Sequence, residues 1–371
     1  MNWQSPATGG PLVADTAHSL TDGVSRYPVI DGIPFLRGGR EELVTGVLDC
    51  LDRGEVEAAT VLLLADQDDW WQGATADPQA LRELVRDHRQ IRLRDAMDLL
   101  AWGPVGTYFA HRWSDPTFLA GLALMEAHWQ APATAFELAC GIGHHLRRLA
   151  QAGVQVTGGD VVFAKLWVAR HFVVPGARLA CFDAGFPWPV AGPVFDLVAC
   201  HDAFYFLDGK PAIAARLRGL LRPGGVLAIG HVHNRDWPNL SAGSAVTAAE
   251  LAALFPAGRA FDDAELTRAL MGARAPQAAG WSALGAVEAF SLVEGASGAP
   301  RALTGGLALP QPGAALVRNP LYDGSGRIAW PSDRYRREYG PRATYPEQAT
   351  PATACAGQAR TRELVDLPER W

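Results

Sequence analysis

Between residues 132 and 255, short apolar runs alternate with segments whose apolar residues recur at helical spacing. The runs that predict strands are 133–139, 154–158, 178–182, 194–200 and 226–232, and the segments that predict helices are 143–152, 163–172 and 211–221. Strands that are buried on both faces of a parallel sheet appear as continuous apolar runs. The pattern therefore predicts an α/β fold with a doubly wound, mostly parallel, Rossmann-like sheet.

The other regions differ from this core in composition. Residues 1–38 are rich in Gly, Pro and Ser, and their Asp31-Gly32 step between two apolar pieces predicts a hairpin within a small β module. Residues 39–131 have helical periodicity and are expected to form a lid or linker. Residues 256–371 form a C-terminal extension that is expected to complete the sheet and to shape a substrate site. The sheet is expected to gain one or two later strands from segments such as 286–294 and 314–322.

Composition narrows the class of protein. The 371 residues are 49% hydrophobic and 19% charged, which suits a globular chain with a large core. A net charge of -6 and the lack of a polybasic stretch argue against nucleic acid as a partner. No apolar run approaches the roughly 18 residues of a membrane span, and the first residues lack the pattern of a signal peptide. With no CxxC spacing, a reducing, cytoplasmic location is expected for the cysteines, Cys50, Cys140, Cys181, Cys200 and Cys355.

The segment 137-ELACGIGHH-145 joins a predicted strand to a predicted helix. Gly141 and Gly143 let the backbone approach a ligand closely, and the following helix directs its first amide groups toward the same place. Asp160 and Asp183 end the next two strands, where an acidic side chain accepts hydrogen bonds from ribose hydroxyls. A glycine turn followed by two such acids indicates a nucleotide site.

These residues resemble a known motif. Glu137-x-Ala139-x-Gly141-x-Gly143 is similar to the acidic-x-Gly-x-Gly-x-Gly motif of class I S-adenosylmethionine-dependent methyltransferases, with Ala139 in place of the first glycine. The resemblance covers roughly residues 105–235 and includes 195-FDLV-198 and 222-RPGG-225. It implies a cofactor, S-adenosylmethionine, and the contacts Glu137, Ala139, Cys140, Gly141, Gly143, Asp160, Val161, Asp183, Ala184 and His201.

Two other functions stay open. A nicotinamide-binding domain also has a glycine turn and an acid after its second strand, but its G-x-G-x-x-G spacing is absent here. A cofactor-binding protein without transferase activity, acting as a regulatory or scaffolding subunit, would account for the altered first glycine. The preferred hypothesis is an enzyme that methylates a small molecule by in-line transfer.

Catalytic candidates follow the fourth and fifth predicted strands, at the sheet edge where α/β proteins bind ligands. In 201-HDAFYF-206, His201 or Asp202 could act as a base and Tyr205 could line the acceptor site. In 231-HVHN-234, alternation places His231 and His233 on one side. His201 could equally contact the cofactor or cap a helix.

Further polar residues have two interpretations each. The histidines together suggest a metal site, but His144 and His145 begin a helix and the set has no recognised ligand spacing, so no metal is expected. The segment 107–116 occupies the usual place of a lid helix, so Tyr108, His111 and Arg112 are candidates for facing cofactor or substrate. The aromatic and arginine-rich segment 330–340 is expected to form a domain interface rather than a ligand site.

The N-terminal residues have a resemblance of their own. The pieces 5-SPATGGPL-12 and 27-YPVIDGIPFL-36 are similar to a zinc-ribbon-like module that accompanies some methyltransferases. Ser5 and Thr8 stand where that module has its first cysteine pair, and no cysteine precedes Cys50. The resemblance therefore implies a metal-free remnant. It is expected to pack on the catalytic domain or, like the C-terminal extension, to bind a protein partner or a second copy of the chain.

Overall fold

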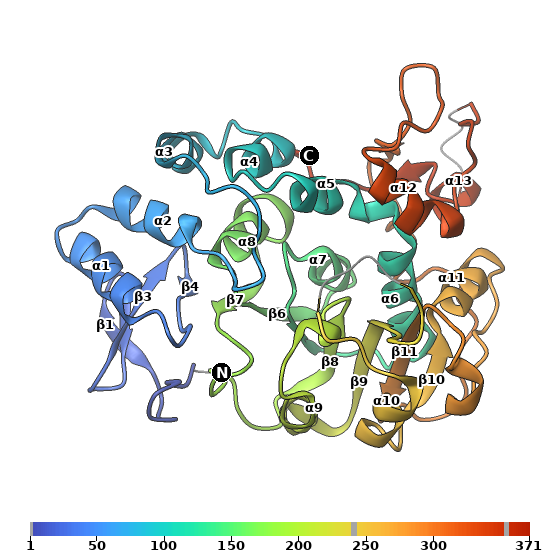
Figure 1. Ribbon diagram of the computed structural model, residues 1–371, viewed down its shortest axis with the longest axis horizontal. Helices are drawn as coiled ribbons and strands as arrows, with labels where there is room; N and C mark the ends of the chain where they lie inside the picture. Colours follow the sequence, from blue (N-terminus) through green and yellow to red (C-terminus); the bar gives the residue numbers. More distant parts are fainter. Residues whose placement is uncertain (1–2, 239–242, 352–355) are drawn as a thin grey trace.

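The computed structural model describes residues 3–238, 243–351 and 356–371. A seven-stranded sheet runs through its centre in the order β10-β11-β9-β8-β5-β6-β7 (Figure 1). The strands are β5 (Thr134–Leu138), β6 (Gln155–Asp160), β7 (Arg178–Cys181), β8 (Phe195–His201), β9 (Leu221–His233), β10 (Arg259–Asp262) and β11 (Ala289–Glu294). Strands β5 to β9 are parallel, whereas β11 is antiparallel to both β9 and β10. The predicted doubly wound, mostly parallel fold is confirmed.

The C-terminal strands differ in part from the expectation. The segment 286–294 contains β11, as predicted, but 314–322 does not enter the large sheet. Its strand β12 (Val317–Arg318) is exposed and pairs with β13 (Leu364–Val365) in a separate two-stranded sheet. The large sheet thus gains one strand from these two segments, because the apolar residues of 314–322, such as Leu321, belong to a small aromatic cluster instead.

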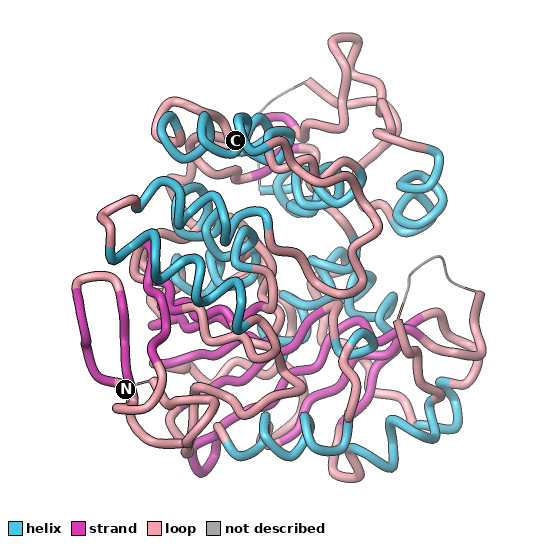
Figure 2. The backbone as a smooth tube through the Cα atoms, turned by 60° about the vertical axis from the view of Figure 1, so that its left-hand side comes forward, coloured by secondary structure: helices cyan, strands magenta, loops and turns pink. Residues whose placement is uncertain are grey.

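Helices cover both faces of the sheet (Figure 2). One core lies beneath α6 (Pro116–Ala127), α7 (His144–Gln151), α8 (Phe163–Val168) and α11 (Asp263–Met271). The other lies beneath α9 (Lys210–Gly219) and α10 (Ala248–Leu254). Every residue of α6 is buried because this helix packs against β9, α7 and α11. The helices predicted over 143–152, 163–172 and 211–221 are present as α7, α8 and α9, and residues 169–173 continue α8 as a π-helix.

The region before the sheet is helical, as expected. It contains α1 (Glu41–Asp52), α2 (Val56–Ala65), α3 (Pro78–Asp87), α4 (Leu93–Leu99) and α5 (Pro104–His111). Asp77 caps α3 and Asp115 caps α6 by accepting hydrogen bonds from backbone amides, and each is followed by a proline in the first helical turn. Helix α5 continues through a short 3-10 helix (Arg112–Ser114) to α6 and brings polar side chains to the carboxyl edge of the sheet.

The N-terminal residues form a four-stranded antiparallel sheet with the strand order β1-β2-β3-β4. Its strands are β1 (Val13–Thr16), β2 (Ser19–Thr21), β3 (Arg26–Ile30) and β4 (Ile33–Pro34). Asp31 and Gly32 both have positive φ, 51° and 73°, which confirms the predicted hairpin turn. Phe35 then pairs with Cys181 of β7, and the Leu36 amide donates to the Cys181 carbonyl at 2.7 Å. The small module thus continues the edge of the large sheet.

Hydrogen bonds hold the loops of this module together. The Asp22 carboxylate accepts from the hydroxyls of Ser5 at 2.5 Å and Thr8 at 3.0 Å. Its other oxygen accepts from the amides of Val24 and Ser25 at 2.9 and 2.7 Å. These contacts lower the pKa of Asp22, with the Ser25 amide contributing most. The hydrogen bonds to the Asp22 carboxylate therefore join the two loops.

The C-terminal residues pack against α5, α6 and α7. Helix α12 (Asp333–Tyr339) contributes to a cluster of buried aromatic residues, and α13 (Ala356–Arg360) precedes β13. Asp366 forms an ion pair with Arg147 of α7 at 2.8 Å, and the Trp371 indole donates to the Ala110 carbonyl at 3.0 Å. In the described parts of the chain, no helix has the length and hydrophobicity that a membrane crossing requires.

Candidate functional site

The carboxyl edge of the sheet has unusual backbone conformations at three strand ends. Ala139 after β5, Asp202 after β8 and His231 near the end of β9 have φ values of 54°, 53° and 51°. A residue with a Cβ atom costs about 1–2 kcal/mol in this left-handed region. Such conformations persist where the surrounding structure enforces them, and they gather at functional sites. Their place on three adjacent strands points to this edge as the site.

The glycine turn between β5 and α7 is held by Asp160 at the end of β6. The Gly141 amide donates to one carboxylate oxygen of Asp160 at 2.9 Å, and the Val162 amide donates to the other at 3.0 Å. Gly141 and Gly143 have φ values of 55° and 85°, and a Cβ atom on Gly143 would lie 2.8 Å from Val174. Both positions therefore need glycine, and the buried acid fixes the turn.

Two segments cover this turn. The ring of Phe109, on α5, lies 3.2 Å from the place of a Cβ atom on Gly141. Lys165 of α8 lies 3.8 Å from Asp160 and 3.5 Å from Asp68, so it ties the loop after α2 to the end of β6. Trp70 of the same loop meets Phe206 edge to face at 6.3 Å. The acidic and tryptophan-containing stretch at 68–71 thus contacts residues around the glycine turn and after β8.

Other predicted cofactor contacts lie around the ends of β5 to β7. Asp183 accepts a hydrogen bond from the Gly185 amide at 2.7 Å and is half-buried. The carbonyl of Val161 faces the Cys181 thiol at 3.4 Å. Cys140 is buried, and burial raises the pKa of its thiol. Ala184 packs into the second core, where its carbonyl accepts a hydrogen bond from Trp188.

Glu137, His145 and His201 form a buried group beneath α6. The Glu137 carboxylate accepts from His145 Nδ1 at 3.0 Å, and the rings of His145 and His201 lie 4.4 Å apart. Burial raises the pKa of Glu137 to about 7 and lowers those of His145 and His201 to about 3. Among the described residues, those with unpartnered buried atoms include all three: Glu137 Oε2, His145 Nε2 and both ring nitrogens of His201. Unpartnered buried polar atoms are costly, and three adjacent residues that carry them make this group a candidate place for a polar ligand.

A second polar group surrounds Asp202. Its carboxylate accepts from the Tyr108 hydroxyl at 2.6 Å, the Tyr205 hydroxyl at 2.9 Å and the Arg112 guanidinium at 2.9 Å. Tyr108 and Arg112, from α5 and the turn after it, are thus brought to the candidate residues after β8. His111 stands apart, because its Nδ1 bonds the Thr107 carbonyl at 2.8 Å.

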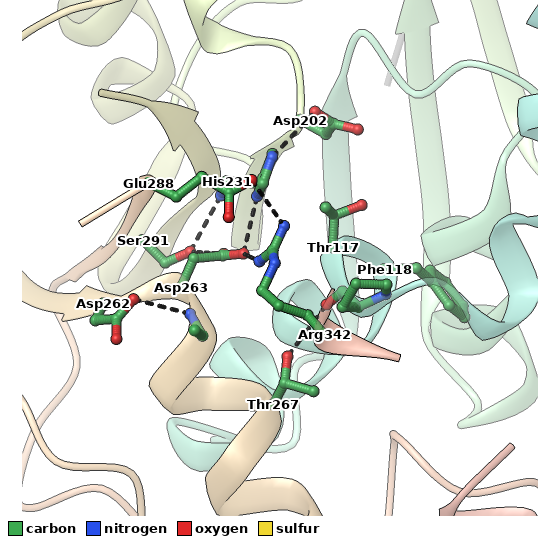
Figure 3. Close-up of polar contacts among 12 residues, drawn as sticks. Thr117, Phe118, Asp202, His231, Asp262, Asp263, Thr267, Glu288, Ser291 and Arg342 are labelled. Atoms are coloured by element: carbon green, nitrogen blue, oxygen red, sulfur yellow. Dashed lines mark hydrogen bonds and ion pairs between the residues drawn. The ribbon is translucent and has the colours of Figure 1, made fainter. Parts of the chain in front are cut away.

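His231 lies next to this group and is held from its other side (Figure 3). Its Nδ1 is 2.8 Å from Asp263 Oδ2, and its Nε2 is 4.0 Å from Asp202 Oδ1. Asp263 also accepts from the Ser291 hydroxyl at 2.8 Å and pairs with Arg342 at 3.1 Å. Burial alone would lower the pKa of His231, but the Asp263 carboxylate outweighs it and raises the pKa.

His233 completes the polar edge of β9. Its ring lies 4.4 Å from Tyr205 and 4.8 Å from His231, and burial lowers its pKa to about 4. Asp202, His231 and His233 offer atoms that lie within 4.8 Å of one another. The neighbouring carboxylates, however, are already paired with guanidinium groups of Arg112 and Arg342. The two guanidinium groups offset negative charge that would otherwise attract a divalent cation.

Comparison with known proteins identifies the central part of the chain. Residues 136–229 match a family described as a methyltransferase domain. The match confirms the predicted methyltransferase domain. These residues contain the glycine turn, Asp160, Asp183 and Asp202 but not His231 or Asp263.

Curated relatives match over part of the chain. The chain is 34% identical over 134 residues to a trans-aconitate 2-methyltransferase of Paracidovorax citrulli, covering 36% of this chain and 49% of the relative. It is 37% identical over 106 residues to a trans-aconitate 2-methyltransferase of Deinococcus radiodurans, covering 28% and 40%. The chain therefore spans half or less of the length of these relatives.

A similar solved structure is an amino pentose methyltransferase from Micromonospora echinaspora with bound S-adenosylmethionine. It has a TM-score of 0.36 and 18% sequence identity, and the alignment covers 50% of this chain and 94% of that one.

The sequence did not single out three residues that complete the surroundings of His231. Asp263 begins α11, Ser291 lies within β11, and Arg342 follows α12. The predicted strand at 286–294 was a usable signal for Ser291, because a strand added beside β9 would bring its side chains next to those of His231 and His233.

Proposed function

We propose that this chain is an S-adenosylmethionine-dependent methyltransferase that acts on a small-molecule acceptor by in-line methyl transfer. The observation that carries the proposal is the match of residues 136–229 to a methyltransferase domain, together with the glycine turn that Asp160 holds at the edge of the sheet. Methyl transfer mainly requires that donor and acceptor be aligned in a site that excludes water.

The described residues fit this cofactor. Asp160 ends β6, where its carboxylate can accept hydrogen bonds from ribose hydroxyls. Glu137 Oε2 is buried without a partner, and such an acceptor suits the ammonium group of the methionine part. Val161 and Asp183, both half-buried at the ends of β6 and β7, would flank the adenine. When bound, the cofactor supplies an electrophilic methyl group on a sulfonium, while the chain supplies the binding groups and the orientation.

The acceptor is proposed to be small. Clustered basic residues, which binding to nucleic acid would need, are lacking in a chain whose net charge is -6. The two curated relatives are named for trans-aconitate, a small organic acid. We place the reaction in the cytoplasm, because the four cysteines in the described residues are buried and unpaired. The N-terminal module, where Val24 is 83% exposed, and the C-terminal extension are proposed surfaces for a protein partner or a second copy.

Calorimetry with S-adenosylmethionine and S-adenosylhomocysteine tests the cofactor. We expect micromolar binding, and Asp160→Ala should weaken it at least tenfold because the ribose loses its acceptor. Asp49→Asn, on the exposed face of α1, removes a carboxylate elsewhere and should bind normally. If neither compound binds in the micromolar range, the proposal is wrong. Binding of reduced nicotinamide dinucleotide instead would favour an oxidoreductase.

Turnover separates an enzyme from a cofactor-binding subunit. Incubation with methyl-labelled S-adenosylmethionine and a panel of small hydroxyl, amine, thiol and carboxylate compounds should transfer label to at least one class. Tight binding of the cofactor without transfer to any class would favour the regulatory or scaffolding alternative.

A further inference from the structure

The imidazole of His231 is fixed from both its ring and its backbone. Its Nδ1 lies 2.8 Å from Asp263 Oδ2, while its backbone amide donates to the Ser291 hydroxyl at 3.1 Å. Ser291 in turn donates to the other oxygen of Asp263 at 2.8 Å. An ionised carboxylate only accepts hydrogen bonds, so the proton of the neutral ring sits on Nδ1. The basic atom of His231 is therefore Nε2.

Nε2 points toward the edge of the sheet where a substrate would lie. It faces Asp202 at 4.0 Å, a separation that is too long for a direct hydrogen bond. Figure 3 shows the ring between Asp202 and Asp263, with Arg342 reaching Asp263 from the C-terminal segment. His231 adopts its left-handed φ of 51° at this point, so the backbone bears strain to present the ring.

The charges around the ring make it more basic than burial alone would. Asp263 and Asp202 raise the pKa of His231, whereas burial and the guanidinium of Arg342 lower it. The titratable and charged groups that face the ring from the surrounding elements are Asp202, His233, Asp263, Glu338 and Arg342. Asp263 is the dominant partner of the His231 ring. Its carboxylate stays ionised at neutral pH, because the pKa of Asp263 is lowered to about 2 despite its burial.

We infer that His231 is the general base of the proposed methyltransferase, that Asp263 positions it, and that the acceptor is a hydroxyl compound. This inference rests on the proposed function. A lone pair of the hydroxyl oxygen forms the bond to the methyl carbon, and the bond from that carbon to sulfur breaks with its electron pair remaining on sulfur. The hydroxyl proton moves to Nε2, and the imidazolium that results is stabilised by Asp263.

The chemistry of the acceptor follows from the need for this base. A hydroxyl group keeps its proton at neutral pH and is a weak nucleophile until a base removes it, so a positioned base accelerates its reaction by about 10² to 10⁴. A thiol ionises far more readily near neutral pH and gains less from such a base. Asp263 is a positioning residue, since it acts through the ring and contacts neither cofactor nor acceptor in this scheme.

The experiment combines a titration with kinetics. The variants are His231→Gln, Asp263→Asn and, as a matched control, Asp49→Asn on α1. Affinity for S-adenosylhomocysteine by calorimetry should change less than threefold in all of them, which separates this inference from the proposed function. If the wild-type chain does not bind S-adenosylhomocysteine, the proposed function is refuted. If Asp263→Asn alone fails to bind it, Asp263 belongs to the cofactor site and the inference is overturned.

NMR titration of the His231 ring in the S-adenosylhomocysteine complex needs no knowledge of the acceptor. Asp263→Asn should lower the pKa of His231 by at least one unit, and an unchanged pKa would overturn the positioning role. With the hydroxyl compound of the panel that turns over fastest, His231→Gln should reduce kcat by 10²-fold or more and Asp263→Asn by about tenfold, with a shifted pH profile.

Three results would overturn the inference. One is transfer to amines, thiols or carboxylates alone. Another is full activity of His231→Gln with a hydroxyl acceptor. The last is one equivalent of a tightly bound transition metal in the wild-type chain that is lost from both His231→Gln and His233→Gln, because a metal-bound ring cannot serve as the base.

Discussion

The guanidinium of Arg342 lies 3.1 Å from the carboxylate of Asp263, although the two residues are 79 positions apart in the chain. Arg342 also reaches Glu288 at 3.3 Å, so the segment after α12 is anchored over the carboxylate that holds His231. The C-terminal extension is therefore part of the electrostatic environment of the site.

This pair gives a prediction with a definite sign. Arg342 lowers the pKa of His231, so Arg342→Gln should raise it. Asp263→Asn should move the same pKa in the opposite direction. NMR titration of the His231 ring in both variants checks this, and shifts in the same direction would contradict the proposed balance of charges.

The buried histidines predict how stability depends on pH. The pKa values of His145 and His201 are lowered to about 3, below the value of about 6.5 in an unfolded chain. The unfolded state then binds more protons below pH 6.5, so the free energy of unfolding should fall as pH falls from 6.5 toward 3. Each histidine contributes up to about 1.4 kcal/mol per pH unit.

Urea unfolding at pH 7, 6 and 5 measures this slope. In His201→Leu, the slope of the free energy of unfolding against pH should decrease by about the contribution of one histidine. A slope equal to that of the wild type would refute the lowered pKa of His201. Glu137 has a pKa raised to about 7 and opposes the histidines above pH 4.5 or so. Glu137→Gln should therefore steepen the fall between pH 6.5 and 4.5.

The residue that replaces the first motif glycine gives a third prediction. Ala139 has a φ of 54°, which glycine adopts without strain. Ala139→Gly should raise the free energy of unfolding by about 0.5 to 1 kcal/mol, after the larger entropy of the unfolded chain is allowed for. Gly141→Ala is the matched control and should be destabilising, because its φ is 55° and Phe109 lies close. Thermal unfolding of both variants measures these changes. An Ala139→Gly variant that is less stable than the wild type would contradict the strained φ of Ala139.

The N-terminal module gives a fourth prediction. The Asp22 carboxylate joins its two loops through Ser5, Thr8 and two backbone amides, so Asp22→Ala should lower the melting temperature and expose these loops to hydrogen exchange. Because the pKa of Asp22 is lowered, its contribution should be complete above the ordinary aspartate range and should be lost progressively as pH falls from that range toward the lowered pKa of the folded state. Unchanged exchange at residues 5–36 would show that other contacts hold the module.

Hydrophobic periodicity located the five parallel strands and three of the helices between them, because strands buried on both faces are uninterrupted apolar runs. It missed β10, since Arg259–Asp262 is a four-residue edge strand with polar residues at both ends. The glycine turn was also readable, because Gly141 and Gly143 are required by backbone geometry that few other residues adopt.

The residues that surround His231 could not be predicted from the sequence. Asp263 reaches the ring only because β11 is added antiparallel to β9 and β10 antiparallel to β11, so that β10 runs in the direction of β9 and the start of α11 lies beside the end of β9. Arg342 arrives through long-range packing of the C-terminal aromatic cluster, which no local pattern encodes. The structure does bring the candidates of the two strands together, since Tyr205 contacts both Asp202 and His233, and His231 lies beside His233.

The packing of the His201 ring limits the substitutions that this protein can accumulate during evolution. It lies between Gly230 of β9 and Gly121 of α6, and a Cβ atom on Gly121 would stand 3.2 Å from its Nδ1 and 2.6 Å from His145 Nε2. A methyl group at either glycine is thus incompatible with the present rings. Once residue 201 becomes small, however, alanine at 230 fits and then obstructs the return of histidine. Positions 201 and 230 therefore form an epistatic pair, in which the order of substitutions decides which sequences can be reached, while Gly121 is also held by His145.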